Sequence, residues 1–217
     1  MKTGINDLDN ILKIKEEDFI IIASRPKMGK STLVQNIIIN VAVIENKPTL
    51  YFSLEDSKEN IVKKLILKTS MIKKEVPIFI DTTIPQTIYE IIEKSHKIKQ
   101  NKNIELIIID CLQLIQFDSK KALSRDNEIR EILKELKKIA KKLKIPIIVT
   151  SQLSRNPEKR KDKRPVITDF ANITSSVLRY ADKILFIYRD SYYNKENKSN
   201  VTDIIVVENE KRIIKDE

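Results

Sequence analysis

Cysteine is almost absent, since Cys111 is the single one among 217 residues. One cysteine excludes a disulfide framework within one chain and suits a reducing compartment. Long apolar runs are also missing: residues 104–115 are interrupted by Glu105 and Asp110, and no run reaches the roughly 18–20 residues that span a bilayer. The N-terminus lacks the apolar region of a signal peptide. We therefore expect a cytoplasmic protein without a membrane partner.

Charge is abundant but unbalanced. Charged residues make up 33% and hydrophobic residues 41% of the chain, which is typical of one globular domain of this length. The formal net charge is +10, which favours a polyanionic partner and nucleic acid first. A lysine-rich composition throughout the chain is the alternative explanation, so the distribution of the cations carries more information than their sum.

Glycine occurs only twice, and one of the two lies in the most informative stretch of the sequence. An apolar run, residues 19–23, leads into Gly29-Lys30-Ser31, and a helical pattern, residues 32–44, leads out. Strand, tight loop and helix in this order are typical of a P-loop, whose backbone N–H groups hold phosphates. The usual pattern begins with a further glycine, where this chain has Ser24. A basic surface turn is the alternative.

The P-loop interpretation assigns nucleotide binding to the whole stretch. Lys30 is expected to reach the β- and γ-phosphates and the Ser31 hydroxyl to coordinate Mg²⁺, which implies ATP and magnesium as cofactors. The predicted nucleotide-binding residues are Ser24, Arg25, Pro26, Lys27, Met28, Gly29, Lys30, Ser31 and Thr32.

Short apolar runs alternate with helical patterns along the whole chain. Strands are predicted at residues 19–23, 49–54, 76–80, 106–109, 146–149, 183–188 and 203–207. Helices are predicted at residues 32–44, 58–68, 84–100, 128–144 and 175–180. This alternation predicts an α/β fold, with a mostly parallel twisted sheet, helices on both faces and an antiparallel hairpin at one edge.

Ligands of such sheets bind at the carboxyl ends of the strands. Asp110 follows a buried strand and is a Walker B aspartate by position, expected to hold Mg²⁺ together with Ser31. Glu55 is predicted to polarise the attacking water as a general base, and Gln152 to contact the γ-phosphate. The predicted catalytic residues are Glu55, Gln152 and Lys30. The alternatives are a helix-terminal acid for Glu55 and a plain strand-end amide for Gln152.

Two basic loops are predicted to bind single-stranded DNA. The first directly follows Gln152, so a γ-phosphate contact there could change its grip on a nucleic-acid backbone. The second follows the strand that ends in Asp110. The predicted DNA-binding residues are Arg155, Lys159, Arg160, Lys161, Lys163 and Arg164 in the first loop and Lys120, Lys121 and Arg125 in the second. Solvated charged loops are the alternative for both.

Together these residues resemble the C-terminal ATPase domain of DnaB-type replicative helicases, within the RecA-like ATPases. Residues 24–31 read S-R-P-K-M-G-K-S, where the family has A-R-P-x-M-G-K-[ST]. Residues 52–55 resemble the segment with the catalytic glutamate, and I-D-C-L-Q-L at 109–114 resembles I-D-Y-L-Q-L. Residues 145–155 are similar to V-P-V-I-x-x-S-Q-L-S-R, and 163–165 and 186–190 also match.

The resemblance implies a single RecA-like ATPase domain over residues 1–217, a hexameric homo-oligomer that hydrolyses ATP between subunits, and translocation on single-stranded DNA. A helicase loader or a primase is an implied partner. Relative to the family, the N-terminal helical domain and linker helix are absent and the segment between Glu55 and Asp110 is short. Acidic residues stand where the family has cations after the last strand, so Lys211 and Arg212 are the candidate cations that act across the subunit interface.

Two functions of different classes follow. The first is an ATP-dependent DNA helicase or translocase domain. The second is a weakly or non-hydrolysing ATP- and DNA-binding accessory paralogue of a replicative helicase, which the altered segment after the last strand favours. A RecA-like recombinase or a clock-type ATPase is a weaker third.

Overall fold

The computed structural model describes residues 1–69, 76–118, 123–194, 196, 199 and 201–208. The helices are α1 (Asn6–Ile11), α2 (Lys30–Ile38), α3 (Lys58–Thr69), α4 (Ile88–Lys102), α5 (Arg125–Leu143), α6 (Thr174–Tyr180) and α7 (Asp190–Tyr193). The strands are β1 (Phe19–Ser24), β2 (Thr49–Ser53), β3 (Ile78–Asp81), β4 (Gln86–Thr87), β5 (Leu106–Asp110), β6 (Ile115–Gln116), β7 (Ile147–Gln152), β8 (Lys183–Tyr188) and β9 (Asp203–Glu208). Within this part of the chain, no helix combines the length and the apolar character that a membrane span requires.

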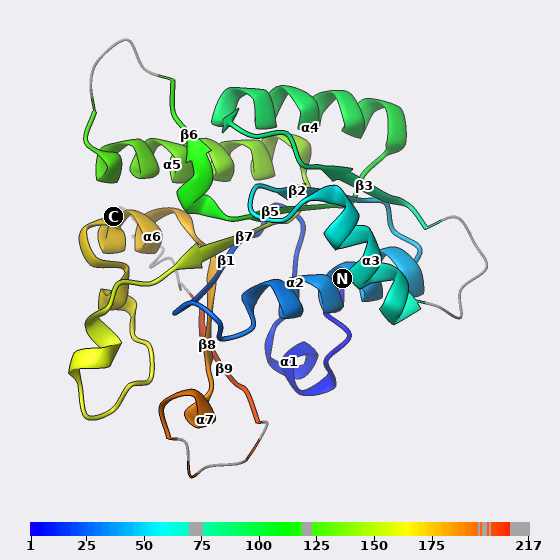
Figure 1. The fold of residues 1–217 in the computed structure, drawn as a ribbon. Helices are drawn as coiled ribbons and strands as arrows, with labels where there is room; N and C mark the ends of the chain where they lie inside the picture. Colours follow the sequence, from blue (N-terminus) through cyan, green and yellow to red (C-terminus); the bar gives the residue numbers. More distant parts are fainter. Residues whose placement is uncertain (70–75, 119–122, 195, 197–198, 200, 209–217) are drawn as a thin grey trace, which may run out of the picture.

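Seven strands form one sheet in the order β3-β2-β5-β7-β1-β8-β9 (Figure 1). All neighbouring strands are parallel except β8 and β9, which are antiparallel. A separate parallel pair joins β4 to β6. The predicted α/β fold with an antiparallel edge pair is therefore confirmed.

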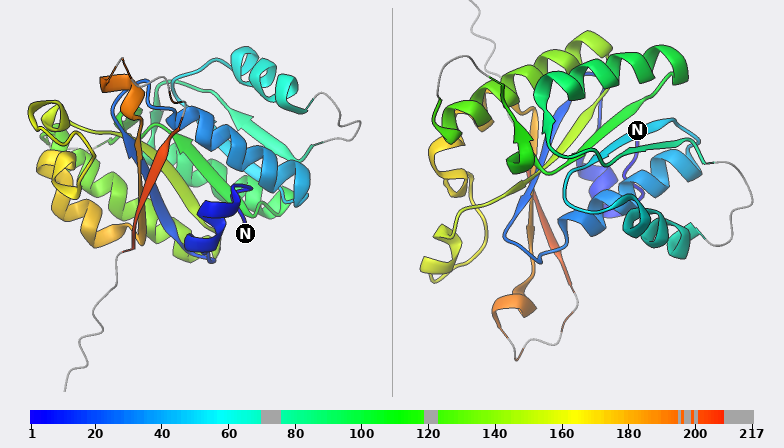
Figure 2. Two further views of the ribbon diagram at one scale, coloured as in Figure 1. Left: turned by 90° about the horizontal axis from the view of Figure 1, so that it is seen from below. Right: turned by 45° about the horizontal axis from the view of Figure 1, so that its top comes forward.

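Helices cover both faces of the sheet, as Figures 1 and 2 show. One core lies between the sheet and α4, α5 and α6, and it contains Ile21 and Val149. The other lies between the sheet and α1, α2 and α3, and it contains Ile20 and Ile22. Because successive strand residues point to opposite faces, the continuously apolar β1 supplies both cores.

Helix starts differ from the predictions where caps decide them. The helix predicted from residue 84 begins at Ile88, because Pro85 cannot continue a helix and Thr87 forms a capping box with Glu90. The helix predicted from residue 128 begins at Arg125, because the Ser124 hydroxyl accepts a hydrogen bond from the Asn127 N–H. Arg125 consequently lies in the first turn of α5 and not in a polar loop.

The lead-in before β1 contains a helix that the sequence pattern did not predict. α1 has six residues and buries only Leu8, which leaves no repeated apolar spacing to detect. Asp9 fixes the turn before it by accepting hydrogen bonds from the Thr3 N–H and hydroxyl and from the Gly4 N–H. The second half of the helix predicted at residues 32–44 is a π-helical segment, Ile39–Ile44, which continues α2.

Candidate nucleotide site and DNA-facing loop

The P-loop is a tight turn between β1 and α2. Gly29 is the residue before the helix and has φ 105°, a conformation that side chains with a Cβ rarely adopt. A Cβ there would meet no atom within 4 Å, so the backbone conformation, and not a lack of space for a side chain, is the reason for a glycine at this position. The turn leaves the N–H groups at the start of α2 free of intrahelical partners, which is the arrangement that binds phosphate.

Ser24, which replaces the usual first glycine, is fully buried at the end of β1. Its hydroxyl donates a hydrogen bond to the Arg25 carbonyl over 2.7 Å. The Lys30 ammonium donates to the Ser24 hydroxyl and carbonyl, over 3.3 and 3.4 Å. Burial lowers the pKa of Lys30, while the negative charge of Asp110 opposes that shift. Ser24 therefore provides the hydrogen-bond acceptors that hold the Lys30 ammonium at the pocket.

Ser31 and Asp110, predicted to share a metal ion, are in direct contact. The Ser31 hydroxyl donates to Asp110 Oδ2 over 2.9 Å, and the Thr150 hydroxyl donates to Asp110 Oδ1. The Tyr51 hydroxyl lies 3.5 Å from Asp110 Oδ2, and burial raises the pKa of Tyr51. The Ser31 hydroxyl at the start of α2 and the Asp110 carboxylate at the end of β5 are hard oxygen donors of the kind that Mg²⁺ prefers, so these two residues fit the ion.

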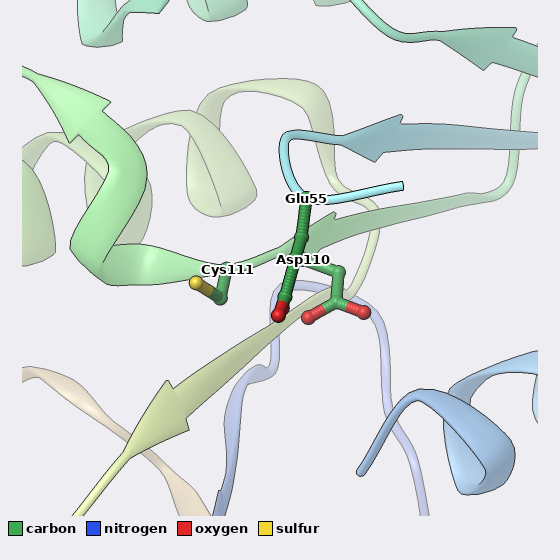
Figure 3. A group of neighbouring side chains, drawn as sticks. All are labelled: Glu55, Asp110 and Cys111. Atoms are coloured by element: carbon green, nitrogen blue, oxygen red, sulfur yellow. The ribbon is translucent and has the colours of Figure 1, made fainter. Parts of the chain in front are cut away.

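Glu55 comes from the segment after β2 and points towards Asp110 and Cys111 (Figure 3). One donor atom from each of these three residues lies within 4.8 Å of the others. The Cys111 thiol is partly buried, and burial together with the nearby carboxylates raises its pKa to about 11. Glu55 is exposed, so its carboxylate is open to solvent.

A pocket of about 500 Å³ joins these groups. Its lining residues are Pro26, Lys27, Gly29, Lys30, Ser31, Thr32, Glu55, Cys111, Gln152 and Arg189. The pocket thus brings together predicted residues that follow β1, β2 and β7, and it adds Cys111, which follows β5 and was not predicted as a site residue. Arg189 was not predicted as a site residue, although it follows β8, the other neighbour of β1. Its Nε is buried and has no hydrogen-bond partner among the described residues.

Gln152 lies opposite Ser24 in the pairing of β7 with β1. Gln113, from the turn after β5, holds this strand end: its side chain donates to the Ser151 hydroxyl and accepts from the Gln152 N–H. Arg125 in turn donates to the Gln113 and Ile115 carbonyls, over 3.0 and 2.7 Å. The exposed Gln152 side chain is therefore carried on a braced strand end.

The basic loop after Gln152 contains two kinds of cation. Arg160 donates to both carboxylate oxygens of the buried Asp169, and Arg164 lies over the Tyr188 ring at 4.9 Å from its centroid. Lys163 donates to the Glu158 and Arg160 carbonyls. Three others are exposed and form no side-chain hydrogen bond or ion pair within the described ranges: Arg155, Lys159 and Lys161.

Four of the basic residues predicted to contact DNA or a neighbouring subunit lie outside the part of the chain that the structure describes. They are Lys120 and Lys121, predicted to bind DNA, and Lys211 and Arg212, predicted to act across the subunit interface. Arg25, predicted to bind nucleotide, points away from the pocket and contacts Glu158 and the Leu153 carbonyl.

A family model for the C-terminal domain of DnaB-like helicases matches residues 1–76 and 71–215. The chain belongs to this family. The replicative DNA helicase DnaB of Geobacillus stearothermophilus is 34% identical, over 94% of this chain and 50% of the relative. The replicative DNA helicase DnaC of Bacillus subtilis is 35% identical with the same coverage. The chain thus spans about half the length of the curated relatives it matches.

Solved structures agree with this membership. One solved ATPase domain superposes with a TM-score of 0.85 at 30% identity, covering 95% of this chain and 82% of that one. A DnaB-like replicative helicase, solved to describe its interactions with primase, superposes with a TM-score of 0.83 at 28% identity. The match covers 95% of this chain and 58% of that one. The KaiC-like protein PH0186 from Pyrococcus horikoshii shares the fold, with a TM-score of 0.65 at 15% sequence identity, covering 96% of this chain and 87% of that one. The resemblance inferred from the motifs is confirmed.

Proposed function

We propose that this DnaB-like domain binds ATP with Mg²⁺, hydrolyses it, and uses the reaction to move along single-stranded DNA. The observation that carries the proposal is the convergence of Lys30, Ser31, Asp110, Glu55 and Gln152 at the carboxyl edge of one sheet. Each side chain has a distinct task in ATP hydrolysis. The curated relatives, which are replicative DNA helicases, support the same activity.

In this proposal the chain positions and activates the reactants. The free N–H groups at the start of α2 and the Lys30 ammonium hold the phosphates, and Lys30 leaves its contacts with Ser24 to do so. Ser31 and Asp110 would hold Mg²⁺, and the ion would supply positive charge beside the phosphate oxygens. Glu55 orients a water molecule and accepts its proton, and Gln152 donates to the γ-phosphate. The partly buried Cys111 lines the pocket beside Glu55.

Arg155, Lys159 and Lys161, which are exposed, are the foremost proposed DNA contacts. They have no internal partner within the described chain, so they can contact phosphates without losing an ion pair. Contacts of this kind give salt-dependent binding with little sequence preference. Lys120 and Lys121 of the second loop remain proposed DNA contacts, as does Arg125 at the start of α5. Arg160, Lys163 and Arg164 also remain proposed contacts, although their side chains, like that of Arg125, already have internal partners.

We further propose a homo-oligomeric ring, a hexamer by family resemblance, in which Lys211 and Arg212 reach the γ-phosphate of the neighbouring subunit. A cation supplied in this way raises the rate by roughly 10³–10⁵. The related helicase whose structure describes its interactions with primase makes a primase a proposed partner, and a helicase loader is another. An accessory paralogue without hydrolysis is less favoured, because Glu55 is present and points into the site.

The decisive experiment measures ATP hydrolysis against protein concentration, with and without single-stranded DNA. We expect a cooperative rise with concentration and stimulation by DNA, because the sites are completed between subunits. Lys30→Ala and Glu55→Gln are expected to abolish turnover, the first with loss of nucleotide binding and the second with binding kept. Turnover by the unmodified chain that equals that of Glu55→Gln at every concentration would refute the proposal.

A further inference from the structure

Arg25 occupies a P-loop position, yet its side chain leaves the nucleotide pocket and reaches the basic loop. Its Nη1 donates to the Leu153 carbonyl over 2.8 Å, and its Nε and Nη2 both lie 2.8 Å from Glu158 Oε1. The Arg25 side chain is 11% exposed and that of Glu158 39%. The contact therefore joins two segments 133 residues apart, one beside the phosphates and one beside the exposed cations.

The segment that carries Glu158 is braced, so a displacement of Glu158 moves its surroundings with it. The base of the loop is fixed by the Leu153 N–H to the Ser24 carbonyl and by the Ser154 N–H to the Asp169 carbonyl, each over 3.0 Å. The Lys163 ammonium donates to the Glu158 carbonyl. Glu158 also lies in the 3₁₀ turn Asn156–Lys159, directly between the exposed Arg155 and Lys161.

A nucleotide bound in the pocket would compete electrostatically with Glu158 for this guanidinium. Arg25 and Lys30 belong to the same turn after β1; burial is the main cause that lowers the pKa of Lys30, and the nearby charge of Arg25 lowers it further, so a phosphate held by Lys30 would also attract Arg25. A triphosphate carries more negative charge there than a diphosphate. ATP would thus weaken the Arg25–Glu158 contact more than ADP does, and the two nucleotide states would favour different positions of the loop.

We propose that the Arg25–Glu158 ion pair couples the nucleotide state to the affinity of the basic loop for single-stranded DNA. The proposal rests on the proposed function, because it requires that the pocket bind nucleotide and the loop bind DNA. Glu158 is a positioning residue: it touches neither phosphate nor DNA, and it sets where Arg155, Lys159 and Lys161 lie. Coupling between two such sites is typically about 5- to 150-fold in affinity.

The test measures the affinity for a fluorescent oligothymidine by anisotropy, once with Mg²⁺ and ADP and once with Mg²⁺ and a non-hydrolysable ATP analogue. The ratio of the two dissociation constants is the coupling. Glu158→Gln removes the charge and keeps the shape. Asp162→Asn is the matched control, because it removes the same charge from the same loop at a side chain that is 73% exposed and 3.9 Å from Arg164.

We expect a ratio of about fivefold or more for the unmodified chain and for Asp162→Asn, and a ratio near one for Glu158→Gln. Glu158→Asp, which keeps the charge on a shorter side chain, is expected to restore part of the ratio. A Glu158→Gln protein that binds DNA with the unmodified ratio overturns the inference, even if its urea midpoint falls. If the unmodified chain binds no DNA in either nucleotide, the proposed function fails and the inference with it.

Discussion

Arg160 was predicted from the sequence to bind DNA, and its contacts make a sharper prediction. Its Nη1 and Nη2 donate to Asp169 Oδ1 and Oδ2, over 2.6 and 2.9 Å. Asp169 is fully buried, and its side chain also accepts a hydrogen bond from the Val166 N–H over 2.8 Å. We therefore expect Arg160→Ala to act chiefly on the fold of the loop.

The magnitude follows from the carboxylate that is left behind. Removing one partner of a buried ion pair costs about 3–5 kcal/mol of stability. The Arg160 side chain is 33% exposed, so water reaches Asp169 once the guanidinium is gone. We therefore expect a loss of about 2–3 kcal/mol, which lowers the urea midpoint by about 1 M at a slope of roughly 2–3 kcal/mol per molar.

The assay pairs urea unfolding with the salt dependence of single-stranded DNA binding. Lys161→Ala is the matched control, since this neighbouring cation is exposed and has no partner in the part of the chain that the structure describes. It is expected to keep the urea midpoint and to reduce the salt slope by about 0.7, the value for one lost phosphate contact on a single strand. The reasoning is refuted if Arg160→Ala keeps its midpoint and reduces the slope as Lys161→Ala does.

Three further predictions concern the pocket. Asp110→Asn takes the charged acceptor from the Ser31 hydroxyl, so the Mg²⁺ concentration for half-maximal ATP hydrolysis is expected to rise by roughly 10–100-fold in a Mg²⁺ titration. Alkylation of Cys111 by iodoacetamide at pH 8, followed by mass spectrometry, is expected to be roughly 100-fold slower than that of a thiol with pKa 9, because its pKa of about 11 leaves less thiolate; an equal rate contradicts this. Arg189→Ala is expected to weaken nucleotide binding roughly tenfold by calorimetry, because the pocket loses a cation, while the exposed Lys138→Ala leaves it unchanged.

Local patterns were sufficient for most of the fold and for most of the residues that line the pocket, but not for Cys111 and Arg189. The continuous apolar runs predicted the buried parallel strands, and polar residues directly after them predicted which side chains meet, because parallel strands end at one edge. Ser31 and Asp110 are 79 residues apart and were predicted together for this reason. The short α1 and the start of α5 were missed, because a six-residue helix and a single serine cap leave little periodic signal.

The functions of the basic residues could not be separated by sequence. Arg160 and Lys161 are neighbours of the same charge, yet one faces the buried Asp169 and the other faces solvent. Arg25 and Glu158 meet across 133 residues, and nothing in either local segment indicates the partner. Such pairings depend on how the loop folds back on the sheet, which periodicity and spacing do not encode.

The one-sided placement of the site has a practical consequence for biophysical work. Every pocket residue follows the carboxyl end of a strand, whereas Lys102, the exposed last residue of α4, precedes β5 and therefore lies at the amino edge. A dye or a surface tether attached there, after replacement of Lys102 by cysteine and of Cys111 by serine, lies at the edge of the sheet opposite the pocket. Lys102 is therefore a position at which single molecules of the domain can be tethered or labelled without contact with the pocket at the opposite edge of the sheet.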